Sequence, residues 1–353
     1  MRALDLLVIK TGALGDVLRT TAILPGLARK HADLRVTWLT AHAARDMVRL
    51  HPLVARVVCV EPLDPVTIAA AGDELERSSF ARVLSLDDEE PLCALASRLG
   101  GDGKAGVLTG AHLRDGRRTY TSDAAPWFDM GLLSRFGKAE ADRLKLRNRE
   151  SQPAIYARML GIEPGEPELP LPEAALAFAQ GFAERTALHA QGPVVGLNTG
   201  AGGRWVSKRL PVERVVRLVR ELARRLDAPT FLLLGGPEEA DRNAAIRDGV
   251  GRAARLVDAG LDNPLLDFAA LVDRVDVLVT SDSLALHVAV ARRRPVVAFF
   301  APTSAAEIEL YGRGEKVVST APDACTYRPD VDTSTLTVER LAQAVERTLG
   351  SRR

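Results

Sequence analysis

The sequence predicts an α/β protein built from two doubly wound domains. Short β-branched runs alternate with helical patterns along the chain, and such alternation is typical of parallel sheets covered by helices. Runs such as FLLL and VVAFF are apolar at every position, which indicates strands buried on both faces. The length of 353 residues also exceeds that of most single hydrophobic cores.

In the first half, a strand opens the chain and a helical pattern follows it over 16–30, where Pro25 is expected to interrupt or kink the helix. The stretch 119–133 lacks clear periodicity and is expected to be irregular. The strands are expected at 4–10, 35–40, 57–60, 83–86 and 105–108.

The second half alternates more regularly, and its last helix is expected to begin after Thr337 as a cap and to end at Gly350. Strands are expected at 194–197, 231–234, 256–257, 277–280 and 296–300. The other helices are expected at 173–189, 211–225, 264–274, 284–291 and from residue 238 onward.

The segment 161–172, GIEPGEPELPLP, is expected to be an interdomain linker because it is rich in proline and glycine. It separates a first domain, 1–172, from a second domain, 173–335. The terminal helix within 336–353 is expected to pack back toward the first domain.

Composition excludes several classes of protein. Lys and Arg number 47 against 46 Asp and Glu, a balance that argues against a dedicated nucleic-acid binder. Three cysteines without CxxC spacing indicate neither a disulfide framework nor a zinc site. The N-terminus does not resemble a secretion signal, and no apolar run approaches the length of a membrane span. We therefore expect a soluble, cytoplasmic protein.

Ligands of doubly wound sheets bind at the carboxyl ends of the strands, so the loops that follow strands are the first place to look. In the loop 10–16, Gly12 and Gly15 allow the backbone to approach a ligand closely. This loop is neither a Walker A motif nor a GxGxxG motif. Asp16 is either a functional carboxylate or a cap that interacts with the helix dipole.

The loop 198–209, NTGAGGRWVSKR, also follows a buried strand. Its small residues expose backbone N–H groups, and Arg204, Lys208 and Arg209 add positive charge, a combination that suits a pyrophosphate. The alternative is a flexible glycine loop with solvated basic side chains. The position of the basic cluster at the end of a strand favours the phosphate site.

Two further loops carry polar residues after buried strands. In GGPEE, Glu238 either accepts hydrogen bonds from ribose hydroxyls or only begins the next helix. In SDSLALH, Ser283 is expected to cap the following helix, whose first N–H groups would then face an anion. His287 lies one turn later and either faces the same spot or belongs to the core.

Two further features are weak evidence for a site. The run 87–90 is expected to be a solvated turn that opens a helix, rather than a metal site. Asp123, Trp127 and Asp129 fall in the irregular stretch 119–133 and are candidates for an acceptor pocket, although nothing in their spacing indicates it.

Four segments together resemble glycosyltransferase family 9, the lipopolysaccharide heptosyltransferases, which have the GT-B fold. VIKTGALGDVLRTTAILPGL is similar to the family's opening strand, turn and Gly-Asp, and NTGAGGRWVSKRLP to its donor-phosphate loop. LLGGPEEADRN is similar to its Gly-x-x-Glu segment, and SDSLALH to its Asp-Ser/Thr-x-x-x-His segment. Leu284 stands where the family usually has glycine, and 202–204 lengthen the phosphate loop.

The resemblance implies two Rossmann-like domains whose parallel sheets face a central cleft. It also implies that Asp16 is the general base, that Lys208 contacts the donor diphosphate and that Glu238 contacts the ribose. The other donor-binding candidates are Thr11, Gly12, Ala13, Asn198, Thr199, Gly200, Arg204, Gly236, Asp282, Ser283, Leu284 and His287.

The activity implied by the resemblance is an inverting transfer of a sugar, with ADP-heptose as the first choice of donor. The acceptor would be a lipopolysaccharide or other surface glycan, lipid-linked or a glycan chain, met peripherally at the cytoplasmic face of the inner membrane. Neither a metal, nor a cofactor beyond the donor, nor a nucleic acid is expected.

The alternatives are a nucleotide-sugar epimerase or hydrolase of the same fold, which would consume the donor without an acceptor, and a non-catalytic sugar-nucleotide-binding protein. A nicotinamide oxidoreductase is disfavoured because no GxGxxG follows a predicted strand.

Overall fold

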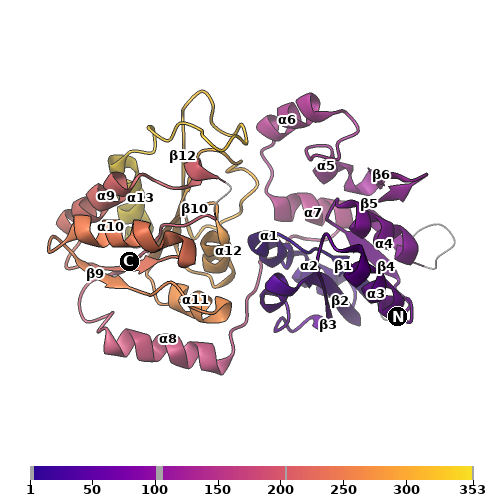
Figure 1. The fold of residues 1–353 in the computed structure, drawn as a ribbon, viewed down its shortest axis with the longest axis horizontal. Coiled ribbons are helices and arrows are strands. Elements are labelled where there is room, and N and C mark those ends of the chain that lie inside the picture. The colour runs from indigo at the N-terminus through magenta and orange to yellow at the C-terminus, as the bar shows by residue number, and fades with distance from the viewer. Residues whose placement is uncertain (1–3, 101–105, 203–204, 352–353) are drawn as a thin grey trace. The chain divides into compact units, whose positions relative to one another are not determined.

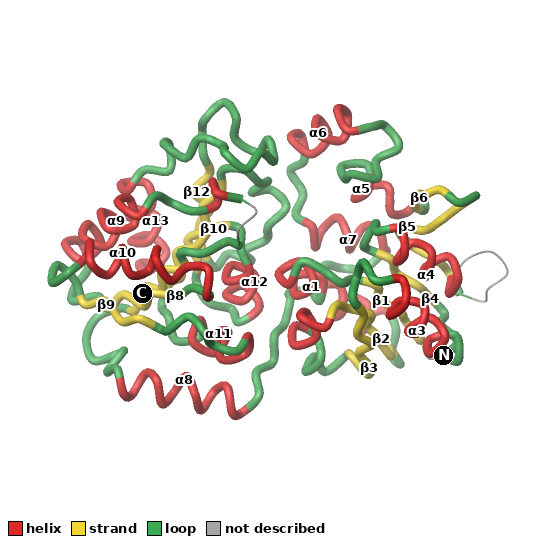
Figure 2. Tube along the Cα trace, in the orientation of Figure 1, coloured by secondary structure: helices red, strands yellow, loops and turns green. Residues whose placement is uncertain are grey.

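The computed structural model (Figure 1) describes residues 4–100, 106–202 and 205–351. The chain divides into two compact units, which join in sequence between Pro170 and Leu171. Each unit contains one six-stranded sheet with helices around it (Figure 2), so the predicted α/β class is confirmed. Among the described residues, no helix combines the length and the apolar character needed to span a bilayer.

The sheet of the first unit consists of β1 (Leu4–Ile9), β2 (Leu34–Ala41), β3 (Val54–Val60), β4 (Arg82–Ser85), β5 (Val107–Arg114) and β6 (Arg117–Tyr120). The strand order is β3-β2-β1-β4-β5-β6, and all pairs are parallel except the antiparallel pair β5–β6. Strand β1 is central, and its last four residues are buried. Residue 105, at the start of the strand predicted over 105–108, lies outside the described residues.

The helices of the first unit are α1 (Leu14–Thr20), α2 (Ile23–Lys30), α3 (Pro65–Leu75), α4 (Glu90–Gly100), α5 (Ala125–Phe128), α6 (Lys138–Arg147) and α7 (Gln152–Leu160), with short 3-10 helices η1 (His42–Met47) and η2 (Ser122–Ala124). Helices α3 and α4 pack on each other and against β3, β4 and β5. Their apolar faces and the sheet form a core that includes Leu7, Ile9, Val83 and Leu92. This core holds the carboxyl ends of β1 and β4 side by side.

Two expectations for the first unit are wrong. The helix expected over 16–30 is two helices, and the break falls at Thr21 and Ala22, ahead of Pro25. Pro25 lies in the first turn of α2, where a missing N–H costs no helical hydrogen bond. The stretch 119–133, expected to be irregular, contains the end of β6 together with η2 and α5.

The sheet of the second unit consists of β7 (Val194–Asn198), β8 (Thr230–Leu234), β9 (Arg255–Asp258), β10 (Val277–Ser281), β11 (Val296–Phe300) and β12 (Gly314–Val318). Its order is β12-β11-β10-β7-β8-β9, with parallel pairing throughout. Strands β8, β10 and β11 are buried at every position, as their apolar runs predict. Strand β12 is missed by the sequence reasoning because it is an edge strand in which Val317 alone is fully buried.

The helices of the second unit are α8 (Glu173–Arg185), α9 (Val212–Arg225), α10 (Ala240–Val250), α11 (Leu265–Val272), α12 (Leu284–Ala291) and α13 (Val338–Gly350), with η3 (Val206–Lys208) and η4 (Pro237–Glu239). Helices α10 and α13 each pack against α9, and α8 and α12 each pack against α11. The Thr337 side chain caps α13 by accepting a hydrogen bond from the N–H of Arg340, as predicted. Helix α13 packs on α9 and β12, within the second unit.

The two sheets share one topology. If the strands of each unit are numbered from its own first strand, both sheets have the order 3-2-1-4-5-6, which is the order of dinucleotide-binding folds. The order reverses between β1 and β4 in the first unit and between β7 and β10 in the second. Ligands bind outside the carboxyl ends of the strands at such a reversal. The loops after these four strands are therefore where each unit should hold its functional residues.

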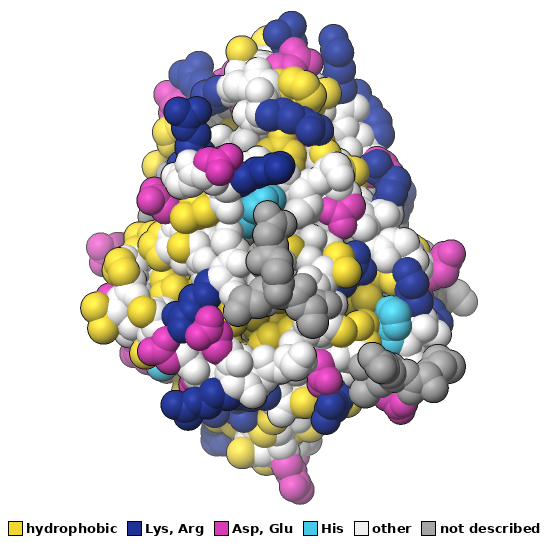
Figure 3. Space-filling model, turned by 90° about the vertical axis from the view of Figure 1, so that its right-hand side faces the viewer, with side chains coloured by type: hydrophobic (Ala, Val, Ile, Leu, Met, Phe, Trp, Pro, Cys, Tyr) yellow, Lys and Arg dark blue, Asp and Glu magenta, His cyan; other side chains and the backbone are white. Residues whose placement is uncertain are grey.

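Basic and acidic side chains are interspersed on the face of the molecule shown in Figure 3. This pattern agrees with the nearly equal numbers of basic and acidic residues. Ion pairs such as Arg98 with Glu76, at 2.7 Å, balance charge locally on the first unit.

Candidate active site

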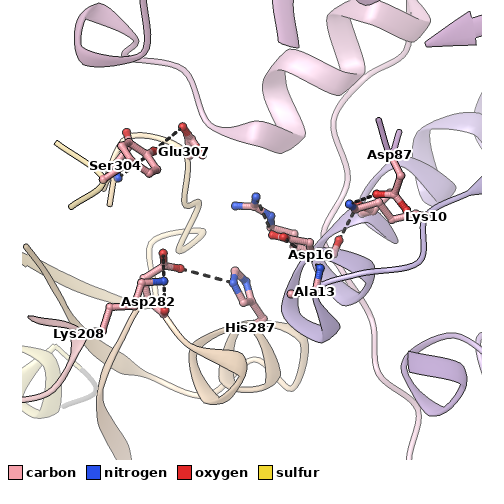
Figure 4. A network of polar contacts seen from close by, with 12 residues as sticks. Lys10, Ala13, Asp16, Asp87, Lys208, Asp282, His287, Ser304 and Glu307 are labelled. Atoms are coloured by element: carbon pink, nitrogen blue, oxygen red, sulfur yellow. Dashed lines mark hydrogen bonds and ion pairs between the residues drawn. The ribbon is translucent and has the colours of Figure 1, made fainter. Parts of the chain in front are cut away.

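In the first unit, one carboxylate ties the loop after β1 to the loop after β4. Asp87 accepts hydrogen bonds from the backbone N–H and from the hydroxyl of Thr11, the latter at 2.7 Å, and it forms an ion pair with Lys10 (Figure 4). The run 87–90, expected to be a solvated turn, therefore begins with a buried structural residue. These contacts join the two loops where the strand order reverses.

The positive charge of Lys10 is paired with a carboxylate of the same unit. Burial alone would lower the pKa of the Lys10 ammonium, but the Asp87 carboxylate raises that pKa above its ordinary value. Lys10 therefore stays charged and paired. Its backbone carbonyl also accepts a hydrogen bond of 3.2 Å from the indole N–H of Trp38, which fixes the end of β1 against β2.

Asp16 lies in the first turn of α1, directly after this loop. Its carboxylate accepts a long hydrogen bond, 3.4 Å, from the backbone N–H of Ala13 and pairs with Arg19 at 2.8 Å. The Asp16 side chain is 37% exposed. Asp16 thus stabilises the start of α1 and still presents its carboxylate to solvent at the carboxyl edge of the sheet.

A cavity of about 710 Å³ lies beside the loop after β1. It is lined by the loops after β1, β3 and β4 and by two aromatic residues of α5, Trp127 and Phe128. Of the three candidates in 119–133, Trp127 lines this cavity. Asp123 and Asp129 instead bond within the unit, to Thr109 and Tyr120 respectively.

In the second unit, Asn198 joins the loops after β7 and β10. Its side-chain amide donates to the carbonyl oxygen of Gly200 at 2.8 Å, to the hydroxyl of Thr280 at 3.1 Å and to the hydroxyl of Ser283 at 3.2 Å. The hydroxyl oxygens of Thr280 and Ser283 are 2.9 Å apart. Three predicted residues, Asn198, Gly200 and Ser283, therefore meet at the reversal of the strand order.

Lys208, Asp282 and His287 form a second polar group at the same edge (Figure 4). The Lys208 ammonium donates to the backbone carbonyl of Asp282 at 2.7 Å and to its carboxylate at 3.0 Å. The other carboxylate oxygen lies 3.7 Å from Nε2 of His287. The Lys208 and Asp282 side chains are only 13% and 17% exposed. A cation is thus held just before the N-terminus of α12, an arrangement that suits an anion.

Ser283 does not cap α12 with its side chain, contrary to the prediction. It occupies the N-cap position but makes no side-chain hydrogen bond to the helix, because its hydroxyl is engaged with Thr280 and Asn198. The Ser283 side chain therefore leaves the first N–H groups of α12 to other partners. Leu284 is the first residue of the helix and is half-buried.

Glu239, rather than Glu238, is the buried carboxylate of the loop after β8. Glu239 is 5% exposed and accepts a hydrogen bond of 2.9 Å from the N–H of Gly236. Its Oε1 is buried and has no hydrogen-bond partner among the described residues. Glu238 is 66% exposed and lies 4.0 Å from Arg209. The structure thus turns Glu238 outward and Glu239 inward, under the loop that contains Gly200.

Three residues predicted in the phosphate loop remain, which are Thr199, Arg204 and Arg209. Thr199 is buried, and its hydroxyl donates a hydrogen bond of 2.5 Å to the side chain of Asn243, which fixes the loop to α10. Arg209 donates to the carbonyl oxygen of Gly202 at 2.7 Å. Arg204 lies outside the described residues. Across the described part of the chain, no group of three or more His, Cys, Asp or Glu side chains is arranged to hold a metal ion.

Comparison with known protein families identifies the family of this chain. The profile of glycosyltransferase family 9 (heptosyltransferase) matches residues 145–334. The match spans more than half of the chain and includes the Lys208 and Asp282 cluster. The chain belongs to glycosyltransferase family 9. It is therefore a glycosyltransferase. The predicted family is confirmed, and three of the four segments that resemble it lie within the matched residues.

Solved structures of other glycosyltransferases share the fold of this family 9 enzyme. The family 9 glycosyl transferase from Veillonella parvula DSM 2008 gives a TM-score of 0.76 at 17% identity over 99% of both chains. ADP-heptose lipopolysaccharide heptosyltransferase II from E. coli gives 0.65 at 17% identity over 99% of both chains. E. coli heptosyltransferase WaaC with ADP gives 0.61 at 19% identity over 98% of both chains. The predicted GT-B class is confirmed, and a search of curated protein sequences finds no match.

Two carboxylates of this family 9 enzyme escaped the sequence reasoning as site residues. Asp87 was assigned to a solvated turn because its partner, Lys10, is distant in sequence. Glu239 follows Gly236 by three positions, and its carboxylate accepts the N–H of that residue as in a capping box. That spacing is the signal by which Glu239 could have been distinguished from Glu238.

A third feature missed in the family 9 enzyme surrounds Tyr327. The Tyr327 hydroxyl donates to Glu307 at 3.1 Å and accepts a hydrogen bond of 3.2 Å from the N–H of Ser304 (Figure 4). The ring of Trp205 packs edge-on against Tyr327 with centroids 6.4 Å apart. No local pattern links these residues, because they come from separate loops of the second unit.

Proposed function

We propose that this glycosyltransferase is an inverting enzyme that transfers heptose from ADP-heptose to a lipopolysaccharide or other surface-glycan acceptor, without a metal ion. The observation that carries the proposal is the Lys208 ammonium, held by Asp282 just before the N-terminus of α12. This cation lies at the carboxyl edge of the second sheet, where its strand order reverses.

The second unit would bind the donor. Departure of ADP builds negative charge on the diphosphate oxygens, and a preorganised ammonium together with helix N–H groups can stabilise that charge in place of a metal ion. Loss of one such donor typically raises the barrier by about 3 kcal/mol. The choice of ADP is supported by two proteins of the same fold, E. coli WaaC with ADP and the E. coli ADP-heptose heptosyltransferase II.

The first unit would supply the general base. In the proposed step, the acceptor hydroxyl oxygen attacks the anomeric carbon and its proton passes to the Asp16 carboxylate. The bond from that carbon to the diphosphate breaks, and ADP leaves with the bonding electrons. Since attack comes from the face opposite the leaving group, the anomeric configuration inverts. A positioned base of this kind contributes about 10²–10⁴-fold in rate.

The acceptor would be lipid-linked or a glycan chain, met at the cytoplasmic face of the inner membrane by peripheral contact. A lipopolysaccharide acceptor is supported by the E. coli ADP-heptose lipopolysaccharide heptosyltransferase II, a protein of the same fold. The donor nucleotide sugar is the one small-molecule partner that the proposal requires.

The test compares Asp16→Asn with Asp46→Asn. Both aspartates are 37% exposed and both pair with an arginine three positions later, Arg19 and Arg49 respectively. Turnover of ADP-heptose with a lipopolysaccharide-core acceptor is expected to fall by about 10²–10⁴-fold for Asp16→Asn. ADP affinity, measured by calorimetry, is expected to stay the same, and Asp46→Asn is expected to behave as the unmodified chain. Full turnover by Asp16→Asn would show that Asp16 is not the base. Failure of the unmodified chain to bind ADP would show that the donor is not an ADP-linked sugar.

A further inference from the structure

The cavity beside the loop after β1 has a strongly acidic lining. Its carboxyl groups belong to Glu61, Asp64, Asp87, Asp88 and Glu89. Among the described residues that line the cavity, the single basic side chain is Lys10. All of these residues belong to the first unit.

The ammonium of Lys10 is engaged within the fold. Lys10 is buried and forms its ion pair with Asp87, whose other oxygen accepts both hydrogen bonds from Thr11. The nearby Arg118 donates to the backbone carbonyl of Asp88 at 2.8 Å, but it does not line the cavity. The other four carboxyl groups of the lining therefore have no ion pair with a cation of the lining, since Lys10 is paired with Asp87.

Glu89 has the most unusual surroundings of the four. Its Oε2 is buried and has no hydrogen-bond partner among the described residues. Its backbone carbonyl accepts a hydrogen bond of 2.9 Å from the N–H of Cys93, which fixes it at the start of α4. Burial, followed by the charge of Asp87, raises the pKa of the Glu89 carboxyl. A buried polar atom without a partner is costly.

The apolar part of the lining suits a sugar ring. Trp127 packs edge-on against Tyr156, with ring centroids 5.2 Å apart, and Phe128 stacks on Tyr120 at 5.4 Å. These contacts hold the two aromatic side chains in place. Rigid aromatic walls with a few fixed polar groups are typical of small-ligand sites.

We propose that the acceptor group entering this cavity is a sugar without phosphate or carboxylate substituents, and that Glu89 binds one of its hydroxyl or amino groups. An anionic substituent would face the uncompensated carboxyl groups and be repelled. A hydroxyl or ammonium group would instead donate to Glu89. This inference concerns the acceptor and rests on the proposed function of the enzyme.

The experiment uses the full chain with ADP at saturation, so that a phosphate group on a probe cannot be bound by Lys208. Glucosamine, glucose and glucose 6-phosphate are titrated by ligand-observed NMR up to about 50 mM, a range that detects millimolar dissociation constants. Glucosamine and glucose are expected to bind, and glucose 6-phosphate is expected to bind at least about tenfold more weakly.

Two charge reversals one residue apart locate the effect. Glu89→Lys is expected to weaken glucosamine binding and strengthen glucose 6-phosphate binding, each by about tenfold or more. Glu90→Lys is the matched control, because Glu90 is exposed, begins the same helix and does not line the cavity. Glu89→Gln, which keeps the size of the side chain, is expected to reduce the preference without reversing it.

Three results would overturn the inference. They are equal binding of glucose 6-phosphate and glucosamine, equal effects of the two charge reversals, and no binding of either glucosamine or glucose. Titration of the same samples with ADP separates failure of the acceptor inference from failure of the proposed function. If ADP does not bind, the proposed function fails. If ADP binds and the sugars show no preference, the acceptor inference alone fails.

Discussion

The carboxyl group of Glu239 occupies the space in which a side chain at Gly200 would stand. A Cβ at residue 200 would lie 2.3 Å from Cδ of Glu239 and 2.5 Å and 2.6 Å from its two oxygens. Since Glu239 also accepts the N–H of Gly236, the loops after β7 and β8 converge on one carboxyl group. Glycine is required at 200 by this close approach.

Gly200→Ala is therefore expected to displace either Glu239 or the loop after β7. Overpacking of this kind lowers the free energy of unfolding by about 1–3 kcal/mol, which urea denaturation would measure. Gly236→Ala is the control, because a Cβ there would make an ordinary contact of 3.6 Å with Glu239. Equal losses of stability in the two variants would contradict the argument.

Asp282→Asn is expected to destabilise the second unit, because it leaves the largely buried Lys208 ammonium without its carboxylate. Breaking a buried ion pair costs about 3 kcal/mol. The double variant with Lys208→Met should recover part of this loss, since both charges are then absent. Asp330→Asn, which removes the exposed partner of Arg328, should change the free energy of unfolding by less than about 1 kcal/mol. A loss for Asp282→Asn as small as for this control would show that the pair contributes little.

Asp87→Asn is expected to loosen the loop after β1. The variant removes the partner of the buried Lys10 ammonium, at a cost of about 3–5 kcal/mol in the free energy of unfolding. Asp88→Asn is the neighbouring control, because the hydrogen bond of 2.8 Å that Asp88 accepts from Arg118 is to its backbone carbonyl. Thermal unfolding of the two variants would measure the difference in stability. An Asp87→Asn protein as stable as Asp88→Asn would mean that Lys10 finds another partner.

Glu89→Gln is expected to change the pH dependence of stability. Burial, then the charge of Asp87, raises the pKa of the Glu89 carboxyl. A carboxyl whose pKa is raised by folding contributes stability at low pH that is lost as the pH rises through the folded pKa. Removing the ionisable group should therefore raise Tm at neutral pH and leave Tm unchanged in acid.

Thermal scans between about pH 4 and pH 8 would test this expectation. Glu90→Gln is the control, because Glu90 is exposed at the start of the same helix. A gain in Tm that persists unchanged in acid would show that Glu89 destabilises the fold through packing and not through its charge.

Most of the fold can be predicted from the sequence because buried parallel strands consist of consecutive apolar residues. FLLL and VVAFF become β8 and β11, which are buried at every position. Strand β12, GEKVV, cannot be found this way, because an edge strand needs only one buried side chain. The break between α1 and α2 is equally hidden, since Pro25 is compatible with the first turn of a helix.

The candidate site is predictable where a polar residue directly follows a buried strand. Asn198 is the last residue of β7 and Asp282 directly follows β10, and parallel pairing of these strands brings their carboxyl ends together. The choice between Glu238 and Glu239 is not predictable from composition, because adjacent carboxylates are equally polar and differ only in the direction that η4 gives them. The role of Asp87 depends on the pairing of β1 with β4, which no local pattern reveals.

The repeated strand order has a consequence for how such enzymes diversify. Each unit carries its own sheet and its own reversal of strand order within one continuous stretch of sequence, so a substitution in one unit does not alter the loops at the carboxyl edge of the other sheet. Under the proposed function, substitutions before Pro170 would change the acceptor while the residues that would bind the nucleotide stay the same.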